Sequence, residues 1–220
     1  AAKNRTSDFY TPSGLHVYFK DKIENDVDVE KVVQRLEDTI PHHLKTEVEM
    51  IIIGQFEEFK QNDFNAFYDS GTVCVTNEQS SEDDMFDDLI HEYAHSIEEP
   101  YGYEIYGDSK IKNEFLAKRN MLHDILWKSG FKAPKSLFTN TEYDKTFDEF
   151  LYKQVGYEKL KRLCVGIFIS AYAPTSLREY FATGFTEFFM YPDAHIYLQK
   201  TSPELYKKLF KLYSEETLDR

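Results

Sequence analysis

A pair of histidines four residues apart is the feature that most constrains what this chain can fold into. The segment His91-Glu92-Tyr93-Ala94-His95 has the pattern HExxH. Residues four apart lie on one face of an α-helix, about one turn from each other, so both imidazoles can bind one metal ion. Imidazole nitrogen is a preferred ligand of Zn²⁺, and the glutamate beside the first histidine can act as general base toward water. The motif predicts a zinc-binding helix with Glu92 as catalytic base; the alternative is two surface histidines on an acidic helix.

The residues around the motif predict where this helix begins and ends. Ser80 or Ser81 is suited to the N-cap, and the acidic run 82–84 follows in the first turn, where the helix dipole favours negative charge. Pro100 stops the helix, because proline cannot continue the backbone hydrogen bonds. We therefore expect the helix to run to about Glu99.

Catalytic zinc needs a third protein ligand and an open position for water. The extended motif HExxHxxGxxH would place glycine at position 98 and histidine at position 101, but this chain has Glu98 and Tyr101 there. Two glutamates of a later predicted helix, Glu179 and Glu187, are the remaining candidates.

The neighbours of the two glutamates favour Glu179. Small side chains, Ala and Thr, follow it on its own helix face and permit close helix packing, whereas bulky residues follow Glu187. Ser176 and Glu179 also form an S-x-x-E capping box, in which the carboxylate would cap backbone instead of binding metal, unless Thr175 is the cap. Glu187 remains a candidate hydrogen-bond acceptor for a ligand histidine.

Outside these segments the sequence offers weaker signals. Tyr172 lies seven residues before Glu179, but spacing alone does not distinguish it from the other tyrosines, of which the chain has 16. Five further histidines lie outside any ligand-spaced motif, and we expect them at the surface or bonded within the protein: His16, His42, His43, His123 and His195.

Composition limits the class of partner. A net charge of −13 repels phosphate backbones and anionic lipids, so we expect neither nucleic acid nor membrane as a partner. No apolar stretch reaches the length of a membrane span. The two cysteines, Cys74 and Cys164, form no disulfide framework, and whether they pair with each other stays open.

The hydrophobic pattern predicts an α+β fold. We expect strands at Leu15–Phe19 and Val48–Ile53, a helix at Val29–Thr39, and a hairpin around Asp69-Ser70-Gly71. The C-terminal half is predicted to be helical over 111–127, 143–150, 157–168 and 177–190, with a linker at 130–139 and a last helix opening at Ser202-Pro203-Glu204. We thus expect an N-terminal subdomain, residues 1–100, with a small mixed sheet and the HExxH helix. A mainly helical C-terminal subdomain, residues 101–220, would carry the third zinc ligand, and the two would form one catalytic domain.

Two segments resemble the catalytic domains of the anthrax lethal factor family, which also includes Pro-Pro-specific endopeptidases. They are HEYAHSIEEPYGY at 91–103 and YAPTSLREYFATGF at 172–185, and VEMIIIGQFEEFK at 48–60 is similar to the family's preceding region. The similarity covers roughly residues 45–190. Thr183 stands where lethal factor has a second glutamate, and the longer gap between His95 and Glu179 implies an insertion near 125–165.

The resemblance implies a zincin-like fold and a zinc metalloendopeptidase of the gluzincin type. The Zn²⁺ ligands would be His91, His95 and Glu179, one ion per chain, with Glu92 as the general base. Tyr172 would stabilise the oxyanion, since the family has a tyrosine seven residues before its ligand glutamate.

Two other functions fit the same residues. One is a zinc-binding docking domain without catalysis, and the other is a zinc hydrolase acting on a non-peptide amide such as a cell-wall crosslink. We expect a monomer that acts on a peptide or protein substrate. The compartment stays open between secretion, after removal of a signal peptide, and the cytoplasm.

Overall fold

The computed structural model describes residues 7–214, which form a mixed α+β protein. The chain divides into two compact units, one ending at Pro100 and the other beginning at Tyr101. The first unit contains β1 Phe9–Tyr10, β2 His16–Phe19, α1 Val29–Thr39, the 3-10 turn η1 His42–Leu44, β3 Met50–Ile53, α2 Glu57–Asn62, β4 Ala66–Asp69, β5 Thr72–Val75 and α3 Glu82–Ile97. The second contains α4 Gly102–Tyr106, α5 Lys110–Lys128, α6 Lys135–Thr139, α7 Lys145–Glu149, the π-helical segment η2 Phe150–Val155, α8 Tyr157–Leu163, α9 Leu177–Met190, α10 Ala194–Thr201 and α11 Pro203–Tyr213.

A five-stranded mixed sheet is the centre of the first unit. Its strand order is β1-β2-β3-β5-β4; β2, β3 and β5 are parallel, and the two outer strands run antiparallel to their neighbours. The inner residues of the parallel strands are fully buried, Val17, Ile51, Ile53, Val73 and Val75. Such β-branched residues suit a strand with a covered face.

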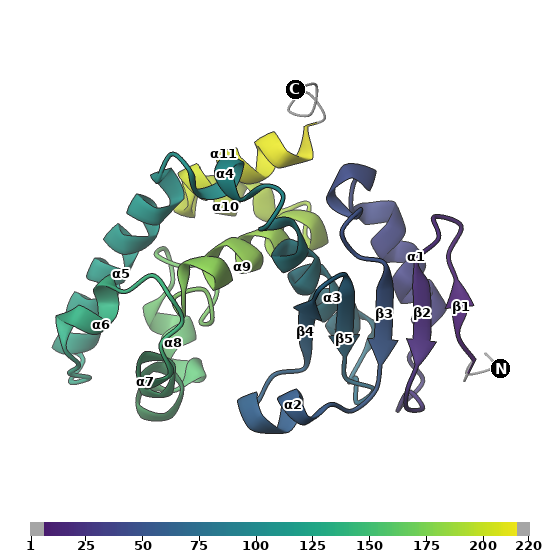
Figure 1. Cartoon of the computed structure of the whole chain (residues 1–220). Helices are drawn as coiled ribbons and strands as arrows, with labels where there is room; N and C mark the ends of the chain where they lie inside the picture. Colours follow the sequence, from purple (N-terminus) through teal and green to yellow (C-terminus); the bar gives the residue numbers. More distant parts are fainter. Residues whose placement is uncertain (1–6, 215–220) are drawn as a thin grey trace. The chain divides into compact units, whose positions relative to one another are not determined.

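Two helices cover that face of the sheet. In Figure 1, α1 and α3 lie behind the strands of this unit, and α3 packs on β4 and β5 as well as on α1. The buried side of α1 is Val29, Val32, Val33 and Leu36, at helical spacing. The motif helix is therefore held by its apolar side against a sheet.

The turn between β4 and β5 explains how the edge strand is placed. Ser70 and Gly71 both have positive φ, of 47° and 87°, as a two-residue hairpin turn of type I′ requires. The turn sets the register, in which Asp69 pairs with Thr72. The predicted hairpin is confirmed.

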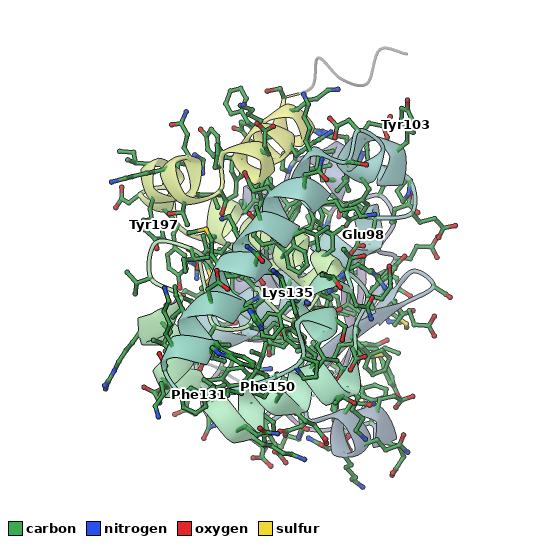
Figure 2. The ribbon with its side chains drawn as sticks, turned by 90° about the vertical axis from the view of Figure 1, so that its left-hand side faces the viewer. Glu98, Tyr103, Phe131, Lys135, Phe150 and Tyr197 are labelled. Atoms are coloured by element: carbon green, nitrogen blue, oxygen red, sulfur yellow. The ribbon has the colours of Figure 1, made fainter. Side chains whose placement is uncertain are left out.

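Three helices enclose the core of the second unit, namely α5, α9 and α11, which contact one another. Aromatic rings fill the space between them: the Tyr180 ring lies 5.4 Å from that of Phe115 and 5.9 Å from that of Phe168. The carboxylate of Glu114 accepts from the Tyr180 hydroxyl at 2.6 Å and from the backbone N–H of Glu204 at 2.7 Å, at the start of α11. At the outer end of this unit Tyr103 projects away from α4, 84% exposed (Figure 2).

The predicted elements are largely confirmed, with differences in the C-terminal half. The helices predicted at 29–39 and 177–190 have those bounds. The predicted linker at 130–139 is partly wrong, because Pro134 precedes a short helix, α6, for which proline's fixed φ is suitable. The helix predicted at 157–168 ends at Leu163, and Gly166 beyond it has a positive φ of 77°. Six short elements were missed: β1, η1, α2, α4, η2 and α10.

Both cysteines are free and buried. Burial raises the pKa of Cys74 to about 11 and that of Cys164 to about 12, so neither thiol forms a thiolate at neutral pH. Among the described residues, no helix is both long and apolar enough to span a lipid bilayer.

Candidate metal centre

The motif helix α3 begins where the sequence predicts. Ser81 is the N-cap, and its hydroxyl accepts the backbone N–H of Asp84 at 3.1 Å. The helix ends at Ile97, two residues before the predicted end. Along it the rings of His91 and His95 have centroids 5.0 Å apart and an interplanar angle of 74°. The i, i+4 spacing thus places the two imidazoles side by side on one helix face.

One group of side chains in residues 7–214 is arranged so that it could hold a metal ion. It consists of His91, His95 and Glu179, whose ligand atoms all lie within 4.8 Å of one another, and each side chain is half-buried. Ligand atoms around tetrahedral zinc are about 3.4 Å apart, which lies within the 4.8 Å limit that these three atoms meet. Two imidazoles and one carboxylate are a donor set that suits zinc, and three ligands leave a fourth position open.

A second carboxylate contacts one of the two histidines. Oε1 of Glu98 lies 2.5 Å from Nδ1 of His95, and the two side chains are only 9% and 12% exposed. In the neutral tautomer that donates from Nδ1 to this carboxylate, Nε2 of His95 is unprotonated, as a metal ligand must be. The HExxHxxGxxH pattern does not predict a role for a glutamate at position 98. The i, i+3 spacing from His95 at the helix end was the signal available for this contact.

Glu92, the predicted base, is 7% exposed on α3. One turn earlier Asp88 accepts a hydrogen bond from Nε2 of Gln79 at 3.1 Å, which links the segment after β5 to the motif helix. Burial raises the pKa of Asp88 to about 6, and Gln79 opposes that shift. Burial also raises the pKa of Asp87, while the charge of His91 lowers it. The part of α3 near the two histidines is therefore rich in carboxylates, and one of them, Asp88, is hydrogen-bonded to the segment after β5.

The helix α9 begins with the cap that the S-x-x-E pattern predicts. The Ser176 hydroxyl accepts the backbone N–H of Glu179 at 3.1 Å, so the alternative cap at Thr175 is wrong. The hydroxyl of Thr175 is buried and has no hydrogen-bond partner among the described residues. Glu179 takes part in this cap bond through its backbone N–H. Its side-chain carboxylate belongs to the group that could hold a metal ion. Glu187, two turns further along α9, does not belong to that group.

Tyr172 precedes α9 in the loop that follows α8. Its backbone N–H donates to the Ser170 hydroxyl at 3.3 Å, and 38% of its surface is exposed. The surrounding protein still raises the pKa of its phenol, through burial first and the negative charge of Glu179 second. Tyr172 therefore lies near Glu179 and stays protonated at neutral pH, as a hydrogen-bond donor must.

Two of the other histidines contact polar atoms of nearby residues. Nε2 of His16 lies 3.0 Å from a carboxylate oxygen of Asp8, and Nε2 of His195 lies 2.7 Å from the carbonyl oxygen of Phe188. Within the described chain none of them belongs to a group that could hold metal.

Comparison with known proteins identifies no relative of this chain. No family model matches the chain, and neither a curated protein nor a solved structure is significantly similar to it.

Proposed function

We propose that this chain is a zinc-dependent metalloendopeptidase with a zincin-like fold, of the gluzincin type and similar to the lethal factor family. The observation that carries the proposal is the meeting of His91, His95 and Glu179, with ligand atoms within 4.8 Å of one another. Two of these residues come from the HExxH pattern and the third from a helix 80 residues later in the chain. A chance HExxH on a surface helix would not explain that meeting.

Zinc bound by these three residues would polarise the scissile carbonyl and lower the pKa of the attacking water. Glu92 follows the first ligand directly and is buried, so its carboxylate can take a proton from that water and later deliver it to the leaving amine. Tyr172 keeps its proton and lies near Glu179, so its hydroxyl can donate to the oxyanion that develops on the carbonyl oxygen.

The topology of the sheet supports a peptide substrate over a non-peptide amide. The strand β4 is at the edge: it pairs with β5, and no strand of residues 7–214 pairs with its other side. The helix with the two histidines packs on this same strand. An extended peptide can add to such an edge through main-chain hydrogen bonds, which would align its backbone beside α3.

The first test is the metal content of the purified protein. Wild type, Glu179→Ala and Glu187→Ala would be measured by inductively coupled plasma mass spectrometry after dialysis against zinc. We expect one zinc per chain in wild type and in Glu187→Ala, and loss of zinc in Glu179→Ala. The Glu187 variant is the matched control, because it removes an acidic residue from the same helix.

Zinc lost only with Glu187→Ala would move the third ligand and remove the support for Tyr172. A wild type that binds no zinc under any condition would refute the proposal. If zinc binds as expected, cleavage of a mixed peptide library at the same zinc occupancy distinguishes a peptidase from a zinc-binding docking domain.

A further inference from the structure

A fully buried arginine lies behind the segment that connects Tyr172 to Glu179. Arg119, on α5, has no exposed surface. Its guanidinium donates four hydrogen bonds, all to backbone carbonyls. Nε donates to Pro174 at 2.6 Å and Nη2 to Thr175 at 2.9 Å. Nη1 donates to Leu137 at 2.9 Å and to Asn140 at 3.1 Å.

Two aromatic rings complete the surroundings of this cation. The guanidinium carbon lies 4.0 Å from the ring centroid of Phe147 and 4.8 Å from that of Phe115. In the described chain no carboxylate forms an ion pair with Arg119; burial lowers its pKa, and the more distant charge of Asp144 opposes the shift. Burying a cation without a partner ion is unfavourable, and an apolar residue would fill such a space at lower cost. The advantage of an arginine at this position is therefore the planar shape of its guanidinium, which can donate to several carbonyls at once.

The four acceptors belong to two stretches of chain that lack long secondary structure. Leu137 and Asn140 lie in and just after α6, while Pro174 and Thr175 are the last two residues before the cap of α9. A further bond joins the same stretches, from the N–H of Leu177 to the carbonyl of Thr141 at 2.9 Å. The planar fork of one arginine thus fixes the chain between Tyr172 and Glu179 to α5.

We propose that Arg119 is a positioning residue for the metal centre, which holds Tyr172 and the start of α9 in the geometry that zinc binding and oxyanion stabilisation need. It touches neither metal nor substrate and acts through the carbonyls of Pro174 and Thr175. This inference rests on the proposed function.

The neighbouring residue offers a matched control. Lys118 is also a buried cation on α5, 7% exposed. Its ammonium group donates to the carbonyl of Thr201 and the hydroxyl of Ser202, both at 2.6 Å, at the start of α11. Lys118 also lies over the Tyr180 ring, 5.3 Å from its centroid. Removal of either cation should destabilise the unit, but only removal of the Arg119 fork should loosen the segment 172–177.

The experiment compares wild type with Arg119→Lys and Lys118→Met by hydrogen exchange of the zinc-free protein. Lysine keeps the charge and most of the stem but has no planar fork, so it cannot reach both loops. In Arg119→Lys we expect the amides of Thr175 and Leu177 to exchange at least about tenfold faster, while Lys118→Met leaves these two near the wild-type rate. Zinc affinity, from competition with a chelator, should fall roughly 10- to 100-fold in Arg119→Lys and stay within threefold in Lys118→Met.

Equal exchange at 172–177 in Arg119→Lys and wild type would overturn the proposal, as would unchanged zinc affinity. If Arg119→Lys fails to fold, Phe147→Leu removes one supporting ring and should accelerate the same amides to a smaller degree; unchanged exchange in that variant would also count against the role. Absence of zinc in wild type would refute the proposed function and, with it, a role of Arg119 at a metal centre. Zinc bound by wild type together with equal exchange in Arg119→Lys would refute the role of Arg119 alone.

Discussion

The contact between Glu98 and His95 permits a sharp test of the metal centre. In the variant Glu98→Gln the side chain keeps its size and can still accept a hydrogen bond, but its negative charge is gone. His95 would then lose the charged partner that orients its ring and raises its basicity as a ligand. We expect the variant to fold normally and to bind zinc more weakly.

The magnitude follows from the geometry. The two atoms are 2.5 Å apart, and the side chains are 12% and 9% exposed, so solvent screens the contact poorly. A hydrogen bond to a charged group contributes about 1.5–3 kcal/mol and a neutral one about 0.5–1.5 kcal/mol, so the exchange of Glu for Gln loses about 1–1.5 kcal/mol. Each 1.4 kcal/mol is a factor of ten in affinity. The dissociation constant for zinc should therefore rise roughly 5- to 10-fold.

The assay is competition for zinc with a chromophoric chelator at pH 7, with Glu99→Gln as the control. Glu99 is the next residue and is exposed, so its replacement changes the net charge equally without touching His95. Zinc binding by Glu98→Gln that stays within twofold of that control would show that Glu98 does not orient the ligand.

Four further predictions concern activity and stability. Glu92→Gln should retain zinc and fold while cleavage falls at least about a thousandfold; loss of zinc in this variant would count against a role as base. Tyr172→Phe should retain zinc and lower kcat by roughly 10²–10³, measured on any cleaved peptide, and an unchanged kcat would remove the phenol from the mechanism. A Cβ added at Gly184 would lie 2.4 Å from Cδ2 of Leu205, so Gly184→Ala should lower the free energy of unfolding by about 1–2 kcal/mol in urea titration, less in a Leu205→Ala background. Burial lowers the pKa of Lys118 from 10.5 to about 8, so the folded protein loses this proton at a lower pH than the unfolded chain. Relative to Lys118→Met, wild type should therefore gain stability as pH rises from 8 to 10.5, and a constant difference would contradict that shift.

The sequence predicted those parts of the fold in which local signals and burial agree. Asp28 and Ser176 are side-chain caps, and the helices after them have the predicted bounds because their apolar residues recur at helical spacing. The β4–β5 hairpin was equally clear from Asp69-Ser70-Gly71. The short helices α2 and α10 were missed, because six and eight residues give too little periodicity to detect.

Of the candidate site, the sequence by itself determined what local spacing can determine. His91, Glu92 and His95 share one helix, so their relation is fixed by the i, i+4 geometry alone. The motif predicted two imidazole ligands and a candidate base, and the neighbours of Glu179 favoured it over Glu187 as the third ligand.

Tertiary structure decided everything that depends on residues far apart in the chain. Whether Glu179 joins the histidines, which carbonyls Arg119 binds, and how tightly Gly184 packs on Leu205 follow from the three-dimensional packing of separate elements. Arg119 and Glu98 show what the sequence alone does not reveal. In the sequence, Arg119 is an ordinary arginine on a long helix and Glu98 is a glutamate at a helix end. Their partners exist only after folding, because a hydrogen bond depends on distance in space and not on distance along the sequence.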